Sequence, residues 1–234
     1  MAAILKRELG AYFSSAIGYI FLAIFYFFSG FYFFAGVLTV NSSDLSIVFE
    51  SMFMIVMFVI PILTMRLFSE EFRGRTDQLL LTSPVSLNGL VYGKFLAAYI
   101  MFAIGAAVTI LYAIIIACFV PLSIMEIIGN IIGILLLGGA LISIGVFVSS
   151  LTKSQVVAAI GSFGVFLLFM YLDVFAQYVP FDWLQTVLNQ LSFMGRYRDF
   201  TAGLLNIADI LYFISVIVVF NFLTVRTLEK KRWG

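Results

Sequence analysis

A run of charged side chains interrupts a largely apolar sequence between residues 66 and 84. Its charged members are Arg66, Glu70, Glu71, Arg73, Arg75 and Asp77. Opposite charges four residues apart, such as Glu71 and Arg75, favour a short helix. Phe72 and the leucines at 79–81 would form an unusual surface in water. The segment therefore indicates contact with another protein, and the alternative is an amphipathic loop in solvent without a partner.

The rest of the sequence offers little for catalysis or metal binding. The absence of histidine excludes histidine-based catalysis, histidine-ligated metals and histidine proton relays. Cys118 is the only cysteine, so no intrachain disulfide can form. The stretch 89–94 differs in glycine spacing from a phosphate-binding loop and follows no predicted strand. We expect it to begin a helix, with Lys94 extending to the membrane surface, and we expect no catalytic residue, metal or cofactor in this chain.

Composition indicates a membrane protein. Of the 234 residues, 63% are hydrophobic and 11% are charged, with a mean hydropathy of +1.15. Soluble domains carry about 25% charged residues. We expect an all-α membrane protein in contact with lipid, folded as a single transmembrane domain over residues 1–234. The net charge of +1 gives no indication of nucleic-acid binding.

Apolar runs long enough to cross a bilayer recur along the chain. A spanning helix needs about 20 apolar residues. This length predicts six transmembrane helices, at residues 17–39, 48–65, 95–119, 127–151, 156–175 and 208–226.

The charged residues orient these spans. Lys and Arg concentrate on the cytoplasmic side of membrane proteins. With the N-terminus inside, the inner segments hold Lys6, Arg7, Arg66, Arg73, Arg75, Lys94, Lys153, Arg226, Lys230, Lys231 and Arg232. The outer segments hold Arg196 and Arg198 together with Asp44, Glu50, Glu126, Asp173, Asp182, Asp199 and Asp209. We therefore expect a plasma-membrane protein with both termini in the cytoplasm.

Two further segments lie outside the predicted spans. Within residues 1–15, an apolar face beside Lys6 and Arg7 predicts a helix lying in the inner membrane surface, and the alternative is a frayed charged terminus. The semi-polar segment 174–207 is too long for a turn. It predicts short helices at the outer membrane interface, or else a packed loop.

The lack of ionisable residues inside the predicted spans indicates how transport by this chain could be driven. An ion-coupled transporter usually keeps such residues within the membrane to bind its driving ion. In this sequence the charged residues fall at predicted span ends or in loops. If the chain transports a substrate, we expect a partner to supply the energy.

Several motifs resemble those of type 2 ABC exporter permeases. The stretch 61–66, followed by Glu70-Glu71 and by 76–85, resembles the coupling region of these proteins, and residues 6–19 resemble their interfacial helix and first span. Gly93-Lys94, Gly203, Asp209 and Tyr212-Phe213 also match, and the group most similar in character is the gliding-motility-associated permeases. Three positions depart from the pattern, namely Arg75 for Gly, Gln78 for Glu and Ala16 for Pro.

The resemblance implies a permease that pairs with a second permease chain, identical or similar, and binds two cytoplasmic ATPase subunits. ATP and Mg²⁺ would be held by those subunits. Residues 66–84 would be the cytoplasmic coupling segment, with a coupling helix from Glu70 to Asp77. Phe72 would be its buried anchor in the partner, because aromatic residues dominate such interfaces. The charged residues would set orientation and partner choice more than affinity.

Two other functions remain open at this point. The chain could be a scaffold that transmits motion to a protein on the outer face, a reading that the segment 174–207 leaves open. It could also be an intramembrane lipid-modifying enzyme, but that function requires polar groups converging inside the membrane, and the sequence shows none.

The topology gives a direct test. Ser83→Cys should be shielded from an impermeant thiol reagent added outside intact cells, whereas Asn41→Cys should react, because positions 83 and 41 lie on opposite sides in the predicted orientation. Labelling of the Ser83→Cys variant from outside would overturn the topology.

Overall fold

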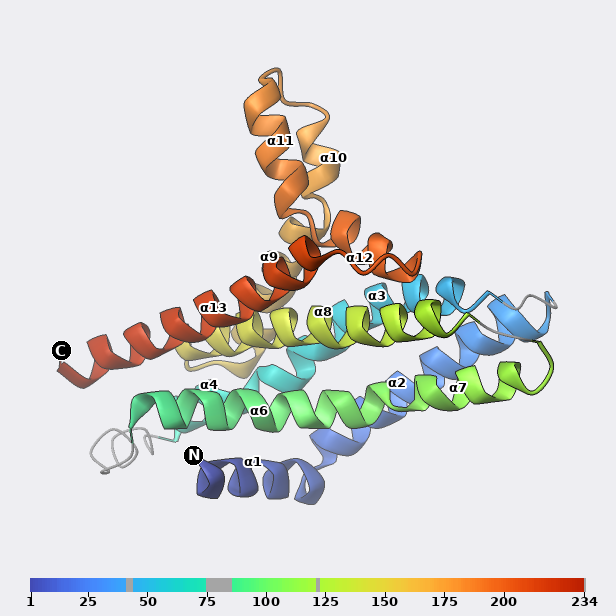
Figure 1. Ribbon diagram of the computed structural model, residues 1–234. Helices are drawn as coiled ribbons and strands as arrows, with labels where there is room; N and C mark the ends of the chain where they lie inside the picture. The colour runs from blue at the N-terminus through green and yellow to red at the C-terminus, as the bar shows by residue number, and fades with distance from the viewer. Residues whose placement is uncertain (41–43, 75–85, 121–122, 234) are drawn as a thin grey trace.

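The computed structural model describes residues 1–40, 44–74, 86–120 and 123–233, and within them all regular structure is helical (Figure 1). The helices are α1 (Ala2–Ser14), α2 (Ala16–Phe33), the π-helix η1 (Phe34–Leu38), α3 (Ser46–Thr64), α4 (Arg66–Arg73), α6 (Leu87–Ala106), α7 (Val108–Ala117), α8 (Ile124–Leu151), α9 (Gln155–Met170), α10 (Leu172–Ala176), α11 (Asp182–Leu191), α12 (Phe193–Thr201) and α13 (Ile207–Trp233). The all-α prediction is confirmed for this part of the chain.

Five segments of the described chain are long and apolar enough to cross a membrane. They are Ala16–Leu38, Ser46–Arg73, Leu87–Ala117, Ile124–Leu151 and Ile207–Arg232. The predicted span 156–175 corresponds to the shorter apolar helix α9, of 16 residues, and to α10 beyond the break at Tyr171. At 1.5 Å per residue, α9 is about 24 Å long, whereas the hydrocarbon core is about 30 Å thick. A sixth span therefore stays a prediction.

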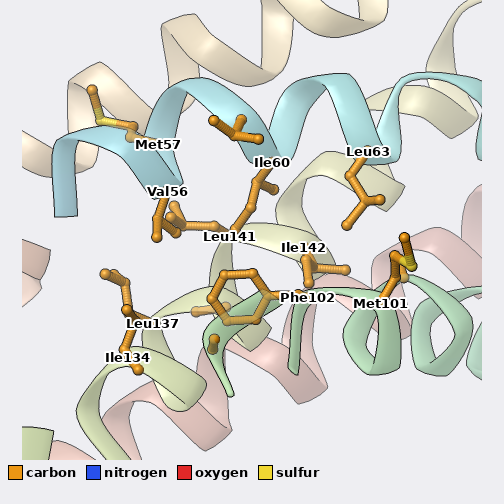
Figure 2. Close-up of a cluster of buried hydrophobic side chains, with 14 of the residues drawn as sticks. Val56, Met57, Ile60, Leu63, Met101, Phe102, Ile134, Leu137, Leu141 and Ile142 are labelled. Atoms are coloured by element: carbon orange, nitrogen blue, oxygen red, sulfur yellow. The ribbon is translucent and has the colours of Figure 1, made fainter. Parts of the chain in front are cut away.

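The core of the bundle lies where α3, α6 and α8 meet. Figure 2 shows Val56, Ile60 and Leu63 of α3 on the side of Met101 and Phe102 of α6 and of Ile134, Leu137, Leu141 and Ile142 of α8, while Met57 points away from them. These side chains are almost completely buried. Helix α8 is central, because it packs against α13, α3, α9, α12 and α6. The helices that carry the charged segment and the C-terminus therefore share one packed core.

The charged residues gather at two ends of the bundle, as their order in the sequence predicts. At the end that we call the basic end, Lys231 Nζ donates to the carbonyl of Ser150 at 2.7 Å, joining α13 to the last turn of α8. At the opposite, acidic end, Tyr197 of α12 donates to the carbonyl of Phe49 at 2.9 Å. Each end is thus closed by hydrogen bonds between helices distant in sequence.

The segment 174–207 contains helices, as predicted. α10 and α11 stand away from the bundle, while α12 returns to it (Figure 1). Among the ten residues of α11, all of them described, none is buried. α12 packs closely on α8, because a β-carbon at Gly129 or Gly133 would lie 2.9 Å or 2.6 Å from atoms of Phe200. The Gly129–Gly133 pair is therefore a packing device.

Glycine also sets the closest approach of α6 and α8. A β-carbon at Gly138 would overlap the ring of Phe102, which is fully buried. The Gly138→Ala substitution should therefore lower the free energy of unfolding by about 1–3 kcal/mol, the usual cost of overpacking. Thermal unfolding in detergent measures this loss.

The matched control is Gly164→Ala on α9, where a β-carbon would meet no atom within 4 Å. We expect it to unfold at the wild-type temperature or slightly above, because alanine favours a helix over glycine. Equal unfolding temperatures for the two variants would contradict the packing described for α6 and α8.

Candidate coupling site

The described part of the charged run forms α4, which follows α3 after the single residue Met65. Leu67, Phe68, Ser69 and Phe72 are buried, and the side chains of Glu70 and Arg73 are exposed. Arg75 and Asp77 lie outside the described residues, as does the predicted pairing of Arg75 with Glu71. Of the predicted coupling residues, Glu70 and Arg73 therefore present charge at the surface.

A buried ammonium group joins α4 to two other helices. Lys94 Nζ on α6 lies 3.0 Å from Glu8 Oε1 on α1 and 2.9 Å from Glu71 Oε1 on α4. It also donates to the carbonyl of Leu67 at 2.6 Å. We call Arg7, Glu8, Glu71 and Lys94 the ion cluster. It connects three helices that are far apart in the sequence.

The expected position of Lys94 at the membrane surface is wrong. Its side chain is only 2% exposed. The physical reason is that α1 and α4 cover the first turns of α6, and two carboxylates and a carbonyl replace water around the ammonium group. The aromatic ring of Phe68 adds a further contact, with its centroid 5.2 Å from Nζ. Lys94 directly precedes the predicted span 95–119, so the expectation that charges lie at span ends and in loops stays a prediction.

The arginine of the cluster bridges the two carboxylates from the solvent side. Arg7 Nη2 lies 2.5 Å from Glu8 Oε1 and 2.9 Å from Glu71 Oε1. Burial acts to raise the pKa of Glu8, but attraction to Lys94 and hydrogen bonds from Arg7 and Lys94 outweigh burial, so the pKa lies below its ordinary value. A carboxyl whose pKa is lowered by folding stabilises the fold above its ordinary pKa, and this contribution is lost as the pH falls through the lowered pKa. Glu8 is therefore a carboxylate at neutral pH.

The N-terminal helix is fixed to α3 as well. Tyr12 donates its hydroxyl hydrogen to the carbonyl of Leu63 at 2.8 Å, and the Arg66 guanidinium lies 5.1 Å from the centre of the Tyr12 ring. Burial raises the pKa of the Tyr12 phenol, which keeps it a donor. Arg66 also donates to Ser15 Oγ at 2.8 Å. Residues 2–14 are thus a packed helix rather than a frayed terminus.

The expectation that Phe72 is exposed, ready to anchor a partner, is also wrong. Phe72 is 5% exposed and its ring stacks on that of Phe68, with centroids 6.2 Å apart. Lys231 Nζ lies 3.7 Å from the centre of the Phe72 ring. The reason is that the end of α13 reaches across α4, so Phe72 anchors α4 within its own chain.

An open hollow of about 420 Å³ lies beside the ion cluster and is lined by Arg7, Glu8, Ala11, Arg66, Leu67, Glu70, Glu71, Gly74 and Lys94. Its charges are of both signs and largely paired with one another. Among the described residues no group of three or more Cys, Asp or Glu side chains is placed to hold a metal ion. What this arrangement offers is a rigid electrostatic connection between helices.

Sequence reasoning missed Glu8 and the inward position of Lys94. One signal was present, because Glu8 falls four residues after Ile4 and four before Tyr12, on the face of α1 that is buried. A carboxylate on an apolar helical face needs a cationic partner. Lys94 is the lysine inside an otherwise uncharged stretch from 78 to 125.

The helical bundle and its apolar segments are those of a multi-pass membrane protein. Residues 3–233 match the family described as ABC-2 family transporter protein, and the chain belongs to that family. The match covers nearly the whole chain and therefore includes every helix of the site. No curated protein matches the sequence.

Removal of the buried ammonium tests the ion cluster. Lys94→Met should lower the free energy of unfolding by about 3–5 kcal/mol, because Glu8 and Glu71 then remain buried with one cation between them. Thermal unfolding in detergent measures the loss. Lys6→Met is the matched control, since it removes the same charge from an exposed position on α1 and should leave the unfolding temperature unchanged.

A second substitution separates charge from shape. Glu8→Gln combined with Lys94→Met should recover part of the lost stability, because one uncompensated charge is removed. If Lys94→Met unfolds no more easily than Lys6→Met, the ion cluster does not hold α1, α4 and α6 together.

Proposed function

We propose that this chain is the membrane-spanning subunit of an ATP-driven exporter, with the basic end in the cytoplasm. Membership of the ABC-2 family supports this function. A partner ATPase would bind ATP and Mg²⁺ and hydrolyse the nucleotide, and the chain would convert the resulting motion into movement of a substrate across the membrane.

The observation that carries the proposal is the attachment of α4. Its surface charges, Glu70 and Arg73, face outward, while Glu71 on the same short helix joins the ion cluster. A force applied to the exposed side of α4 would pass through Glu71 to Lys94 on α6 and, through Lys94, to Glu8 on α1. Rigid connections of this kind are required if a cytoplasmic partner is to move helices that cross the membrane.

We also propose six spans in the plasma membrane, with α9 as the sixth. α9 and α10 together cover residues 155–176, and the break at Tyr171 separates them. If α9 crosses the membrane, the number of crossings is even and the two termini lie on the same side, where Lys and Arg gather. Two ATPase subunits would require a second permease chain, identical or similar, to provide the second docking surface.

A specific observation favours a second function, that of a scaffold acting on a protein at the outer face. α10 and α11 stand away from the bundle, and Tyr178 and Trp183 are 83% and 68% exposed there. The two functions differ in one measurable respect. If the chain is an exporter subunit, the ATPase bound to it hydrolyses ATP faster when the substrate is present in vesicles. If the chain is a scaffold subunit, the bound ATPase hydrolyses ATP faster only when the outer-face partner is present.

Reversal of the exposed charges on α4 tests the docking surface. Glu70→Lys combined with Arg73→Glu should reduce the amount of copurified ATPase about tenfold or more, because like charges brought together at an interface cost several kcal/mol. The unfolding temperature should remain near that of the wild type, since both side chains are exposed and the one ion pair lost among the described residues, Arg66 Nε to Glu70 Oε2 at 3.9 Å, is partly in solvent and contributes about 1 kcal/mol or less. Copurification from native membranes, quantified by mass spectrometry, gives the result.

Lys153→Glu is the matched control, because it reverses an exposed charge at the same end of the bundle but outside α4. It should retain the ATPase. Phe72→Ala is unsuitable for this purpose, since loss of a buried ring would weaken α4 itself. Full ATPase retention by the doubly reversed variant would rule out α4 as the docking helix.

A further inference from the structure

The junction between α3 and α4 is completed by a residue of another helix. α3 ends at Thr64 and α4 begins at Arg66. Met65 between them keeps helical dihedral angles (φ −54°, ψ −33°) and donates to the carbonyl of Pro61, so the interruption lies in the hydrogen-bond ladder and not in the course of the backbone. Ser149, in the last turn of α8, is fully buried against this junction. The N-cap residue of α4, Met65, makes no capping hydrogen bond with its side chain.

The hydroxyl of Ser149 makes three hydrogen bonds there. It accepts from the backbone N–H of Phe68 at 3.1 Å and of Ser69 at 3.2 Å, and it donates to the carbonyl of Met65 at 3.1 Å. The first N–H groups of a helix have no partner within that helix. Ser149 therefore caps α4 from α8, in the place that a Ser or Thr at the helix start would normally occupy.

Proline does not account for this interruption. Pro61 lies one turn earlier, and the bond that it removes is the one to the carbonyl of Met57. A side chain inserted into the hydrogen-bond ladder is a known cause of a helix break. The inserted group at Met65 is the Ser149 hydroxyl, and the Ser69 hydroxyl donates to the same Met65 carbonyl.

We propose that Ser149 is a positioning residue that ties α4 to α8 at this break, so that motion of α4 is transmitted into the central helix of the bundle. That motion passes from α4 to α8 rests on the coupling role proposed above. That Ser149 holds α4 against α8 does not depend on that role. Ser150, the next residue, accepts a hydrogen bond from Lys231 at 2.7 Å. The last turn of α8 therefore holds α4 through Ser149 and α13 through Ser150.

The test is the distribution of distances between α4 and α8 in the isolated permease in lipid nanodiscs, without an ATPase. Spin labels are placed by Arg73→Cys on α4 and Ile128→Cys on α8, both at exposed positions, in a Cys118→Ala background. Pulsed electron paramagnetic resonance should give a narrow distribution of distances between the two labels when position 149 is serine. Ser149→Ala should widen it about twofold or more, because the N–H of Phe68 loses its partner in α8.

Ser143→Ala is the matched control on α8, since the Ser143 hydroxyl is equally buried but bonds only to the carbonyl of Ala140 in its own helix. It should leave the distribution narrow. Ser149→Thr and Ser149→Val form a second pair that differs in one hydroxyl at nearly equal shape. The Thr variant should keep the narrow distribution and the Val variant should widen it.

The second pair also covers the case in which Ser149→Ala does not fold. A distance distribution as narrow in Ser149→Ala as in the wild type would overturn the proposal. Equally wide distributions in Ser149→Thr and Ser149→Val would also overturn it, as would failure of both of these variants to fold. Because no ATPase is present, a failure of ATPase docking at α4 would leave these results unchanged, so the two proposals can fail separately.

Discussion

The packing of the basic end depends on one constraint, the burial of the Lys94 ammonium group. An ion removed from water costs several kcal/mol unless opposite charges and hydrogen bonds replace the solvent. Glu8 and Glu71 provide the charges and the carbonyl of Leu67 provides the further acceptor. These groups come from α1 and α4, so both helices must lie on α6 for Lys94 to be satisfied. An apolar contact could stabilise the same helices, but it would not fix their relative positions so narrowly.

Other helices that are distant in sequence also hold α4 in place. α8 caps it through Ser149, and α13 covers its buried ring, Phe72, with Lys231. A helix of eight residues is too short to be stable alone, so its conformation is set by the surrounding helices, which are α1, α6, α8, α9 and α13. Its outward side chains, Glu70 and Arg73, remain exposed, with Glu70 Oε2 3.9 Å from Arg66 Nε. α4 is therefore well suited to receive a force on one face and pass it to the bundle through the others.

Sequence reasoning predicted the all-α class, the approximate positions of five membrane-spanning segments and the separation of charge between two ends. These features depend on local hydropathy and charge, which are visible in one dimension. The partners of Lys94, Glu71 and Phe72 were not predictable in this way. Each is set by a helix far away in sequence, such as α1 for Lys94 and α13 for Phe72. The span at 156–175 was predicted as one helix, but the chain breaks at Tyr171.

If a partner ATPase acts on α4, the ion cluster requires that α1, α4 and α6 move as one body. Cryo-electron microscopy of the purified complex with its copurifying ATPase, without nucleotide and with a non-hydrolysable ATP analogue, tests it directly. The distances from Lys94 Nζ to Glu8 Oε1 and Glu71 Oε1, 3.0 Å and 2.9 Å here, should be kept in both states while α4 shifts relative to the acidic end. A nucleotide-bound state in which α4 has moved and left Lys94 and Glu8 behind would contradict the account.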